Sequence, residues 1–135
     1  MKSLFVSKEE TVTVDVYSFI NEEKGEMYIS ENKDVLLKKS SATEEQIVKN
    51  SVVFRVPTYG DNKAIYEDSV RIENGEVHMD PFKLRHNKFV LLVKDWDFKD
   101  ETGEPLSVSV DNVNNMSPAL ADLILDELEK IIGVG

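Results

Sequence analysis

Acidic side chains gather around the only tryptophan of this chain and offer the first chemistry to consider, which is metal binding. Asp95, Asp97, Asp100 and Glu101 carry hard oxygen ligands of the kind that calcium prefers. Their spacing does not fit an EF-hand loop, because a loop starting at Asp95 needs an oxygen ligand at Lys99 and a glycine at Asp100. We therefore predict no metal ion here and interpret the segment as a solvated acidic turn.

The two histidines are the remaining candidates for a catalytic centre. His78 and His86 lie eight residues apart with Asp80 between them, whereas a catalytic zinc ion generally has three protein ligands and an open fourth position. The chain has no cysteine, which excludes disulfides, thiolate zinc sites and cysteine nucleophiles. It also has no glycine-rich phosphate loop, G-x-S-x-G elbow or H-E-x-x-H helix. The sequence therefore predicts no catalytic residue and no cofactor.

Charge and composition narrow the classes of partner. The chain has 26 acidic and 16 basic residues, a formal net charge of -10 and a pI near 4.6. Direct nucleic-acid binding is not expected, since it depends on Lys and Arg neutralising phosphates. There is no run of 18 apolar residues, and the first ten residues become charged too early for a signal peptide, so neither membrane insertion nor export is expected. A length of 135 residues fits one domain, strand-rich over 1–79 and helix-rich over 80–135.

Strand patterns dominate the first half of the chain. Residues 11–16 alternate polar residues with valines, which places three valines on one face of a half-buried strand. Residues 21–26 interrupt this pattern before residues 27–30, so a hairpin with a longer loop is expected. Residues 52–56 predict another strand, which Pro57 ends because proline lacks the N–H that a sheet requires.

Two turns follow in the middle of the chain. Asn74 and Gly75 accept the positive φ values of a two-residue type I′ turn and predict a hairpin over residues 70–79. Residues 58–61 predict a turn, and Asp61 is placed to cap a helix that begins there.

Helix caps divide the rest of the chain. Ser41 precedes Glu44 by three residues, the spacing of a capping box, and predicts a short helix over residues 42–50. Residues 117–118, Ser-Pro, start the strongest helix, which Gly133 should end. Its apolar sector contains Leu120, Leu123, Ile124, Leu125, Leu128, Ile131 and Ile132.

The segment from Asp80 to Asp111 fits more than one secondary structure. Asp80 and the proline after it predict a helix whose apolar positions continue to Trp96, although residues 89–93 also fit a buried strand. Residues 106–111 alternate like a short edge strand, and residues 112–115 resemble a loop. Together the patterns predict an α+β fold in which N-terminal antiparallel strands and hairpins pack with C-terminal helices.

Apolar and aromatic side chains are the candidates for contact with another protein. The tyrosine after the proline turn has little core to enter, and the terminal helix has an apolar sector wide enough to serve a partner. The competing interpretation is burial within the domain, above all for the tryptophan and the terminal helix. The candidate contact residues are Tyr59, Trp96, Phe98, Leu106, Leu120, Ile124 and Leu128.

Four features follow one another between residues 82 and 132. An apolar helix leads to Trp96-Asp97-Phe98, then to the turn of residues 100–106, and finally to a helix started by Ser117-Pro118. This order resembles small tailed-bacteriophage proteins of the tail-assembly-chaperone or minor virion type, and residues 54–61 resemble a proline-centred segment of such proteins more loosely. The strand-rich start departs from the mostly helical structure of tail chaperones, which favours a tail, neck or baseplate component.

The resemblance implies a non-enzymatic role in phage assembly. The expected partners are other phage structural or assembly proteins, and a homo-oligomer is compatible with that role. The protein would reside in the host cytoplasm during assembly or in the virion. An alternative is a small acidic host-directed regulator or inhibitor that binds a basic protein surface by charge complementarity. An enzyme of an unrecognised type is a third hypothesis.

Overall fold

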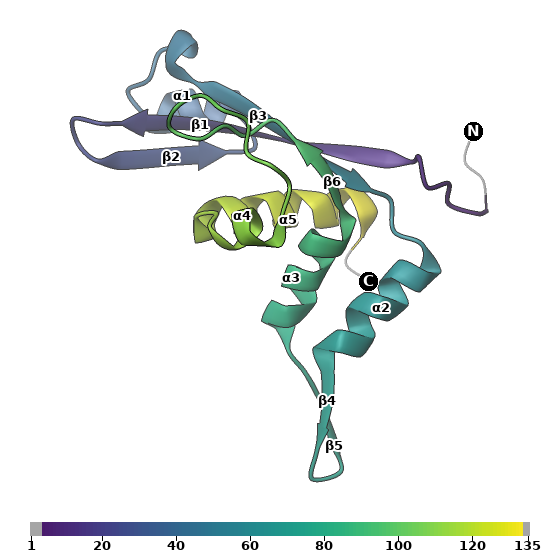
Figure 1. Ribbon diagram of the computed structural model, residues 1–135. Coiled ribbons are helices and arrows are strands. Elements are labelled where there is room, and N and C mark those ends of the chain that lie inside the picture. The colour runs from purple at the N-terminus through teal and green to yellow at the C-terminus, as the bar shows by residue number, and fades with distance from the viewer. Residues whose placement is uncertain (1–3, 134–135) are drawn as a thin grey trace.

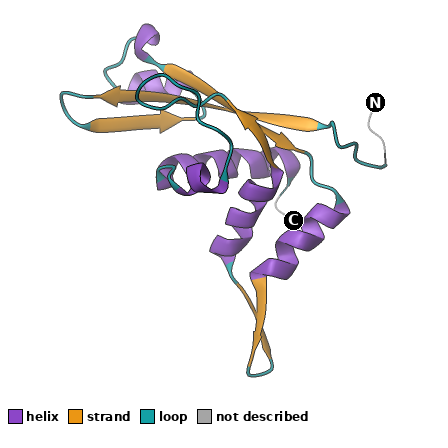
Figure 2. Ribbon diagram, in the orientation of Figure 1, coloured by secondary structure: helices purple, strands orange, loops and turns teal. Residues whose placement is uncertain are grey.

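A four-stranded antiparallel sheet forms one layer of the protein, and most of the helices lie beneath it (Figures 1 and 2). The computed structural model describes residues 4–133. In chain order the elements are β1 (Thr11–Asn21), β2 (Glu26–Ser30), α1 (Lys33–Lys39), the 3₁₀ helix η1 (Glu44–Gln46), β3 (Val48–Arg55), α2 (Tyr59–Ser69), β4 (Val70–Glu73), β5 (Glu76–Met79), α3 (Pro81–Leu92), β6 (Val93–Trp96), α4 (Val110–Asn114) and α5 (Pro118–Ile132). The predicted α+β class is confirmed.

The sheet has the strand order β2-β1-β3-β6, and β1 is its longest strand. Its residues 11–18 pair with β3, whereas only its residues 17–21 pair with β2. The predicted strand over residues 11–16 and the hairpin that follows are therefore confirmed. A separate two-stranded sheet, β4-β5, extends away from the body.

The core lies between the sheet and the helices below it. Val14 and Val16 point into it from β1, with 2% of each side chain exposed. Phe54 of β3 meets Phe89 of α3 edge to face, with ring centroids 5.3 Å apart. The core cluster consists of Val14, Val16, Val52, Phe54, Ile65, Phe89, Leu92, Trp96, Val113, Ile124, Leu125 and Leu128. α5 supplies three of these residues and so closes the core from below.

The predicted helix over residues 42–50 is wrong. The capping box in this region joins Thr43 and Gln46 around the short η1, and the chain is already in strand β3 from Val48. Pairing of β3 with β1 along residues 48–55 recruits the segment into the sheet, so tertiary pairing outweighs the local helix signal. Helix α1, capped by Asn32, was not predicted.

The helix that starts after Asp80 is shorter than predicted. Asp80 caps α3 by accepting from the N–H groups of Phe82 and Lys83, as expected. α3 ends at Leu92, and the chain continues as β6, where Trp96 pairs with Val52 of β3. The predicted continuation of the helix to the tryptophan is therefore wrong, and so is a strand over residues 89–93.

Three smaller predictions also need correction. The N-cap of α2 is Thr58, while Asp61 is the third helical residue and accepts from the Thr58 N–H to complete a capping box. Residues 106–111 form no strand, and helix α4 occupies part of the segment predicted as a loop. The terminal helix is confirmed, with Ser117 as its cap and Gly133 at φ 86° after its end.

Candidate protein interface

The β4-β5 hairpin forms an arm, residues 70–79, that projects beyond α2 and α3 (Figure 1). α2 leads directly into the arm, and α3 begins two residues after it. The turn at its tip has φ 52° at Asn74 and 79° at Gly75, the positive values that a type I′ turn requires. The predicted hairpin over these residues is confirmed.

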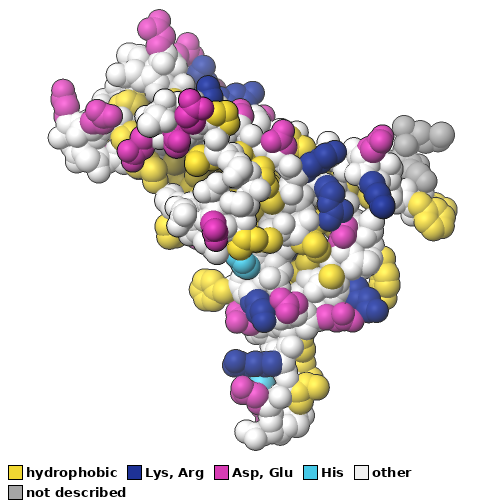
Figure 3. Space-filling model, viewed as in Figure 1, with side chains coloured by type: hydrophobic (Ala, Val, Ile, Leu, Met, Phe, Trp, Pro, Cys, Tyr) yellow, Lys and Arg dark blue, Asp and Glu magenta, His cyan; other side chains and the backbone are white. Residues whose placement is uncertain are grey.

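The two faces of the arm differ in chemistry. Residues opposite each other in an antiparallel pair share a face, and the pairs here are Val70 with Met79, Arg71 with His78, Ile72 with Val77 and Glu73 with Glu76. One face is therefore wholly apolar and the other is charged or polar. On the apolar face 74% of Ile72, 70% of Val77 and 51% of Met79 is exposed. Figure 3 shows apolar atoms along one side of the arm and charged atoms along the other.

Polar contacts fix the base of the arm to the two helices. The Asp80 N–H donates to the Ser69 carbonyl at 2.9 Å and extends the strand pairing by one step. Asn87 of α3 donates to the Asp68 carboxylate at 2.9 Å, and Lys83 lies 3.8 Å from the same carboxylate. A lone two-stranded hairpin is marginal in water, so this base holds the arm in a defined direction.

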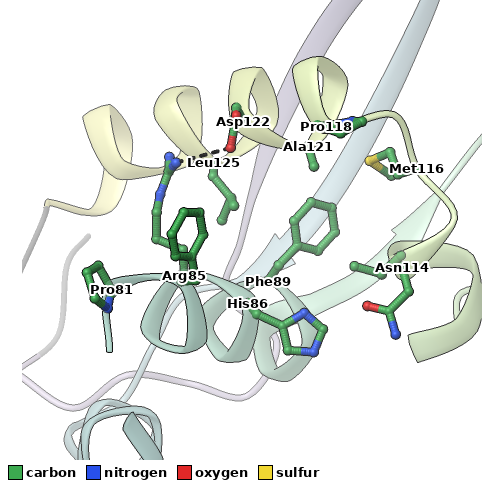
Figure 4. A pocket seen from close by; sticks show the side chains of 12 residues that line it. Pro81, Arg85, His86, Phe89, Asn114, Met116, Pro118, Ala121, Asp122 and Leu125 are labelled. Carbon is green, nitrogen blue, oxygen red and sulfur yellow. Dashed lines mark hydrogen bonds and ion pairs between the residues drawn. The ribbon is translucent and has the colours of Figure 1, made fainter. Parts of the chain in front are cut away.

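A cavity of about 470 Å³ lies between α3 and α5, on the side of α3 shown in Figure 4. Its wall is mainly apolar, and Phe82, 87% exposed, stands at it. The lining residues are Pro81, Phe82, Arg85, His86, Phe89, Val113, Asn114, Met116, Pro118, Ala121, Asp122 and Leu125. Its mainly apolar wall makes the cavity suited to receive an apolar group.

Arg85 of this cavity is already engaged by the protein. Its guanidinium donates to Asp122 at 3.3 Å, to Asp126 at 2.7 Å and to Glu129 at 3.2 Å. Burial alone would lower the pKa of Arg85, but the hydrogen bond and charge of Glu129, with those of Asp126, raise it above its ordinary value. The nearby Lys88, buried, lies 3.6 Å from Glu129. These contacts connect α3 to α5, so the role of Arg85 that the structure shows is to stabilise the packing of the two helices.

The Trp96 segment is part of the core. Trp96 is 8% exposed, its indole Nε1 donates to the Leu106 carbonyl at 2.7 Å, and its ring meets Phe98 edge to face at 5.5 Å. The Leu106 N–H donates back to the Phe98 carbonyl at 2.9 Å. Trp96, Phe98 and Leu106, three of the predicted contact residues, are thus brought together, but to fasten the loop that follows β6.

The acidic turn after Phe98 is closed by its own carboxylate. Asp100 Oδ1 accepts from the Thr102 hydroxyl at 2.6 Å, from the Thr102 N–H at 2.8 Å and from the Glu104 N–H at 3.0 Å. The Thr102 hydroxyl, and then the Glu104 N–H, lower the pKa of Asp100 below its ordinary value. Within residues 4–133, no group of three or more His, Cys, Asp or Glu side chains is placed to hold a metal ion.

The other predicted contact residues are scattered. Tyr59 is 87% exposed as the first residue of α2, about 15 Å of helix from the arm. Ile124 and Leu128 are completely buried in the core, and Leu120 is half-buried against it. The α5 side chains at positions 124 and 128 are therefore not available at the surface, because the sheet covers them.

The arm is the surface that the sequence-based prediction missed. Its signal was present: an Asn-Gly turn between two four-residue alternating segments, followed at once by the helix cap Asp80. Because helices precede and follow this short hairpin, no further strand lies next to it in the sequence to extend it into a larger sheet. What the pattern could not reveal is that no other described element covers its apolar face.

None of the helices within residues 4–133 has both the length and the apolar character needed to span a bilayer. Comparison of the chain with protein-family models, curated proteins and solved structures gives no match.

Proposed function

We propose that this protein is a non-enzymatic bacteriophage virion or tail-assembly protein that acts by binding other phage proteins. The class of partner rests on the resemblance of residues 82–132, with its Trp96 segment and capped terminal helix. The mode of action rests on one structural observation, the exposed apolar face of the arm. A packed partner on this face would turn an exposed hairpin into part of an interface core.

The arm has the properties of a docking element. Its base is held by hydrogen bonds, so little conformational freedom is lost when a partner binds. Fully burying an Ile, Val or Met side chain contributes about 1.5–3 kcal/mol. Covering Ile72, Val77 and Met79 from their present exposure would therefore contribute roughly 3–6 kcal/mol, or a Kd change of over a hundredfold. This is a large share of the free energy of a micromolar complex.

The net charge of -10 is compatible with a subunit that must stay soluble before it binds its partner. Like charges keep separate copies soluble, and they offset the tendency of an exposed apolar ribbon to aggregate. Charge alone would hold a partner weakly at high ionic strength, whereas apolar contact persists. The arm therefore favours an assembly contact over a regulator held only by charge.

The test is co-purification of the tagged protein with tail, neck, baseplate or head proteins from phage-infected cells. Ile72→Gln on the apolar face should weaken capture about tenfold, because the lost burial is about 1–2 kcal/mol. His78→Gln is the matched control, since it places the same residue on the opposite face of the same arm without changing the formal charge.

Both variants should melt at the temperature of the unsubstituted protein, because neither position belongs to the core. Equal capture by Ile72→Gln and by the unsubstituted protein would contradict the role of the arm. Capture of no phage protein, or release of the partner in high salt, would contradict the proposed assembly function.

A further inference from the structure

The N-terminal half of β1 has an open edge. β3 pairs with it along residues 11–18, but β2 reaches only residues 17–21 on the other side. Residues 11–16 therefore have no strand neighbour on that side within the described chain. The edge is bounded at one end by Ser30, which ends β2 opposite Tyr17, and at the other by a turn in which the Glu10 N–H donates to the Ser7 carbonyl at 3.1 Å.

The orientation of the backbone groups along this edge follows from the pairing with β3. The Val56 N–H donates to the Glu10 carbonyl at 3.0 Å, so residue 10 faces β3, and so do the even-numbered residues after it. Alternate residues of a strand direct their N–H and C=O groups to opposite edges. Thr11, Thr13 and Asp15 thus present three donors and three acceptors to the open side.

The usual protections of a sheet edge are missing from this segment. Thr-Val-Thr-Val-Asp-Val contains no lysine or proline and forms no bulge with β3. Its threonines and valines favour strand structure. The single charge, Asp15, is already engaged by Lys49 at 3.8 Å and accepts from the Ser51 hydroxyl at 2.6 Å. The edge is therefore ready to pair with another strand.

We propose that this edge pairs with the same edge of a second copy, antiparallel and about a two-fold axis at Thr13. In that register Thr13 lies opposite Thr13 of the other copy, and Thr11 lies opposite Asp15. All outward-facing groups are then used, which gives six backbone hydrogen bonds. Val12 lies opposite Val14, so the apolar face of the sheet continues across the axis.

Alternative registers are worse. A shift by two residues toward the end of β1 would bring the partner chain against Tyr17, where β2 already lies. A further shift would set Asp15 opposite Asp15, and like charges opposite each other are destabilising. A shift the other way would leave Asp15 without a strand partner, because the partner chain leaves the strand at its turn of residues 7–10. Only the register centred on Thr13 uses the whole edge.

Cysteine cross-linking tests both the pairing and its register, because the natural chain has no thiol. Cα atoms of a hydrogen-bonded antiparallel pair are about 5.5 Å apart, within the range that a disulfide spans. Thr13→Cys should therefore cross-link two copies rapidly under mild oxidation. Thr11→Cys is the matched control, since its two thiols would lie on residues about 14 Å apart.

Light scattering of the full chain provides the second measurement. The unsubstituted protein should be a dimer at micromolar concentrations, and the dimer should tighten as salt screens its net charge. Thr13→Pro removes an N–H that faces outward, so it should raise the dimer dissociation constant at least tenfold while the far-UV circular dichroism stays unchanged.

A monomer at every concentration, or a folded Thr13→Pro variant that dimerises as tightly as the unsubstituted protein, would overturn the proposal. Equal cross-linking rates for Thr11→Cys and Thr13→Cys would overturn the register. These outcomes are independent of whether the arm binds a phage protein.

Discussion

Replacing Trp96 with alanine should lower the free energy of unfolding by about 3–5 kcal/mol, the range for truncating a buried aromatic side chain. The indole is 8% exposed, and β6 holds it against β3 opposite Val52. The loss includes the edge-to-face contact with Phe98 and the Nε1 hydrogen bond to the Leu106 carbonyl. A second variant separates these contributions.

Trp96→Phe keeps an aromatic ring in the core but removes the indole N–H. The lost hydrogen bond contributes about 0.5–1.5 kcal/mol, and the smaller ring adds part of a cavity cost. We therefore expect a loss of about 1–3 kcal/mol, between the unsubstituted protein and the alanine variant. Because the bond fastens Leu106, the loop of residues 97–106 should also become more sensitive to proteolysis.

Urea unfolding followed by far-UV circular dichroism is the suitable assay, since each variant removes the only tryptophan and its fluorescence. Tyr59→Ala serves as the control, because its ring is 87% exposed and its loss should change stability by about 0.5 kcal/mol or less. A loss below about 1 kcal/mol for Trp96→Ala would refute the assignment of the indole to the core. If capture of a phage protein disappeared at the same time, the tryptophan would be a contact residue.

Two further predictions concern the ionic contacts that join the helices and the sheet. Arg85→Met should cost about 1–3 kcal/mol in urea unfolding, because it leaves Glu129, 19% exposed, with Lys88 as its remaining cation. The control is Lys63→Met, at an ion pair with Glu67 in which both side chains are exposed, and it should cost about 0.5 kcal/mol or less. Burial alone would raise the pKa of Asp61, but hydrogen bonds from Arg55, and then from the Thr58 N–H, lower it below its ordinary value. Its contribution to stability is therefore fully present above about pH 4 and is lost as the pH falls through the lowered pKa, so Asp61→Asn should destabilise at pH 7 and make little difference near pH 2. Equal losses at both pH values would contradict this linkage.

Local chemistry made several elements predictable from the sequence. The caps Asp80 and Ser117 accept from N–H groups within three residues of them, and the Asn-Gly turn needs only its own backbone. The valine alternation of β1 also needs no distant information, because a half-buried strand shows its period directly. These signals located two helix starts, a hairpin and the longest strand.

Long-range pairing accounts for the elements that were wrong. The apolar run before Trp96 fits a helix as well as a strand, and the transition at Val93 is set by β3, some forty residues earlier in the chain. Residues 48–50 likewise join the sheet because β1 lies beside them. A capping-box spacing at Ser41 contains no information about which strand will pair with the residues that follow it. Contacts across such distances are outside what periodicity and caps describe.

The sequence predicted candidate contact residues but not the arm. Composition argued against nucleic acid, and the acidic residues near the tryptophan lacked a calcium-loop spacing; both absences stay predictions. Exposure of Tyr59 followed from its place after a proline turn and is confirmed. The arm offers an apolar surface because no described element packs against Ile72 and Val77, which the sequence does not show. Ile124 is buried because the sheet lies over α5. Both are properties of the assembled fold.

The two proposed surfaces constrain each other geometrically. The arm points away from the sheet on the side where the helices lie, while the open edge of β1 belongs to the sheet itself (Figure 1). A two-fold axis at Thr13 that continues the sheet must run perpendicular to it, so both copies keep their helices on the same side. The two arms would then point in the same general direction. Such a dimer could engage two neighbouring copies of a partner at once, and the second contact would form at high effective concentration. This increase in binding strength would be largest on a partner with repeated subunits, such as the proposed phage tail, because two arms can then bind neighbouring subunits.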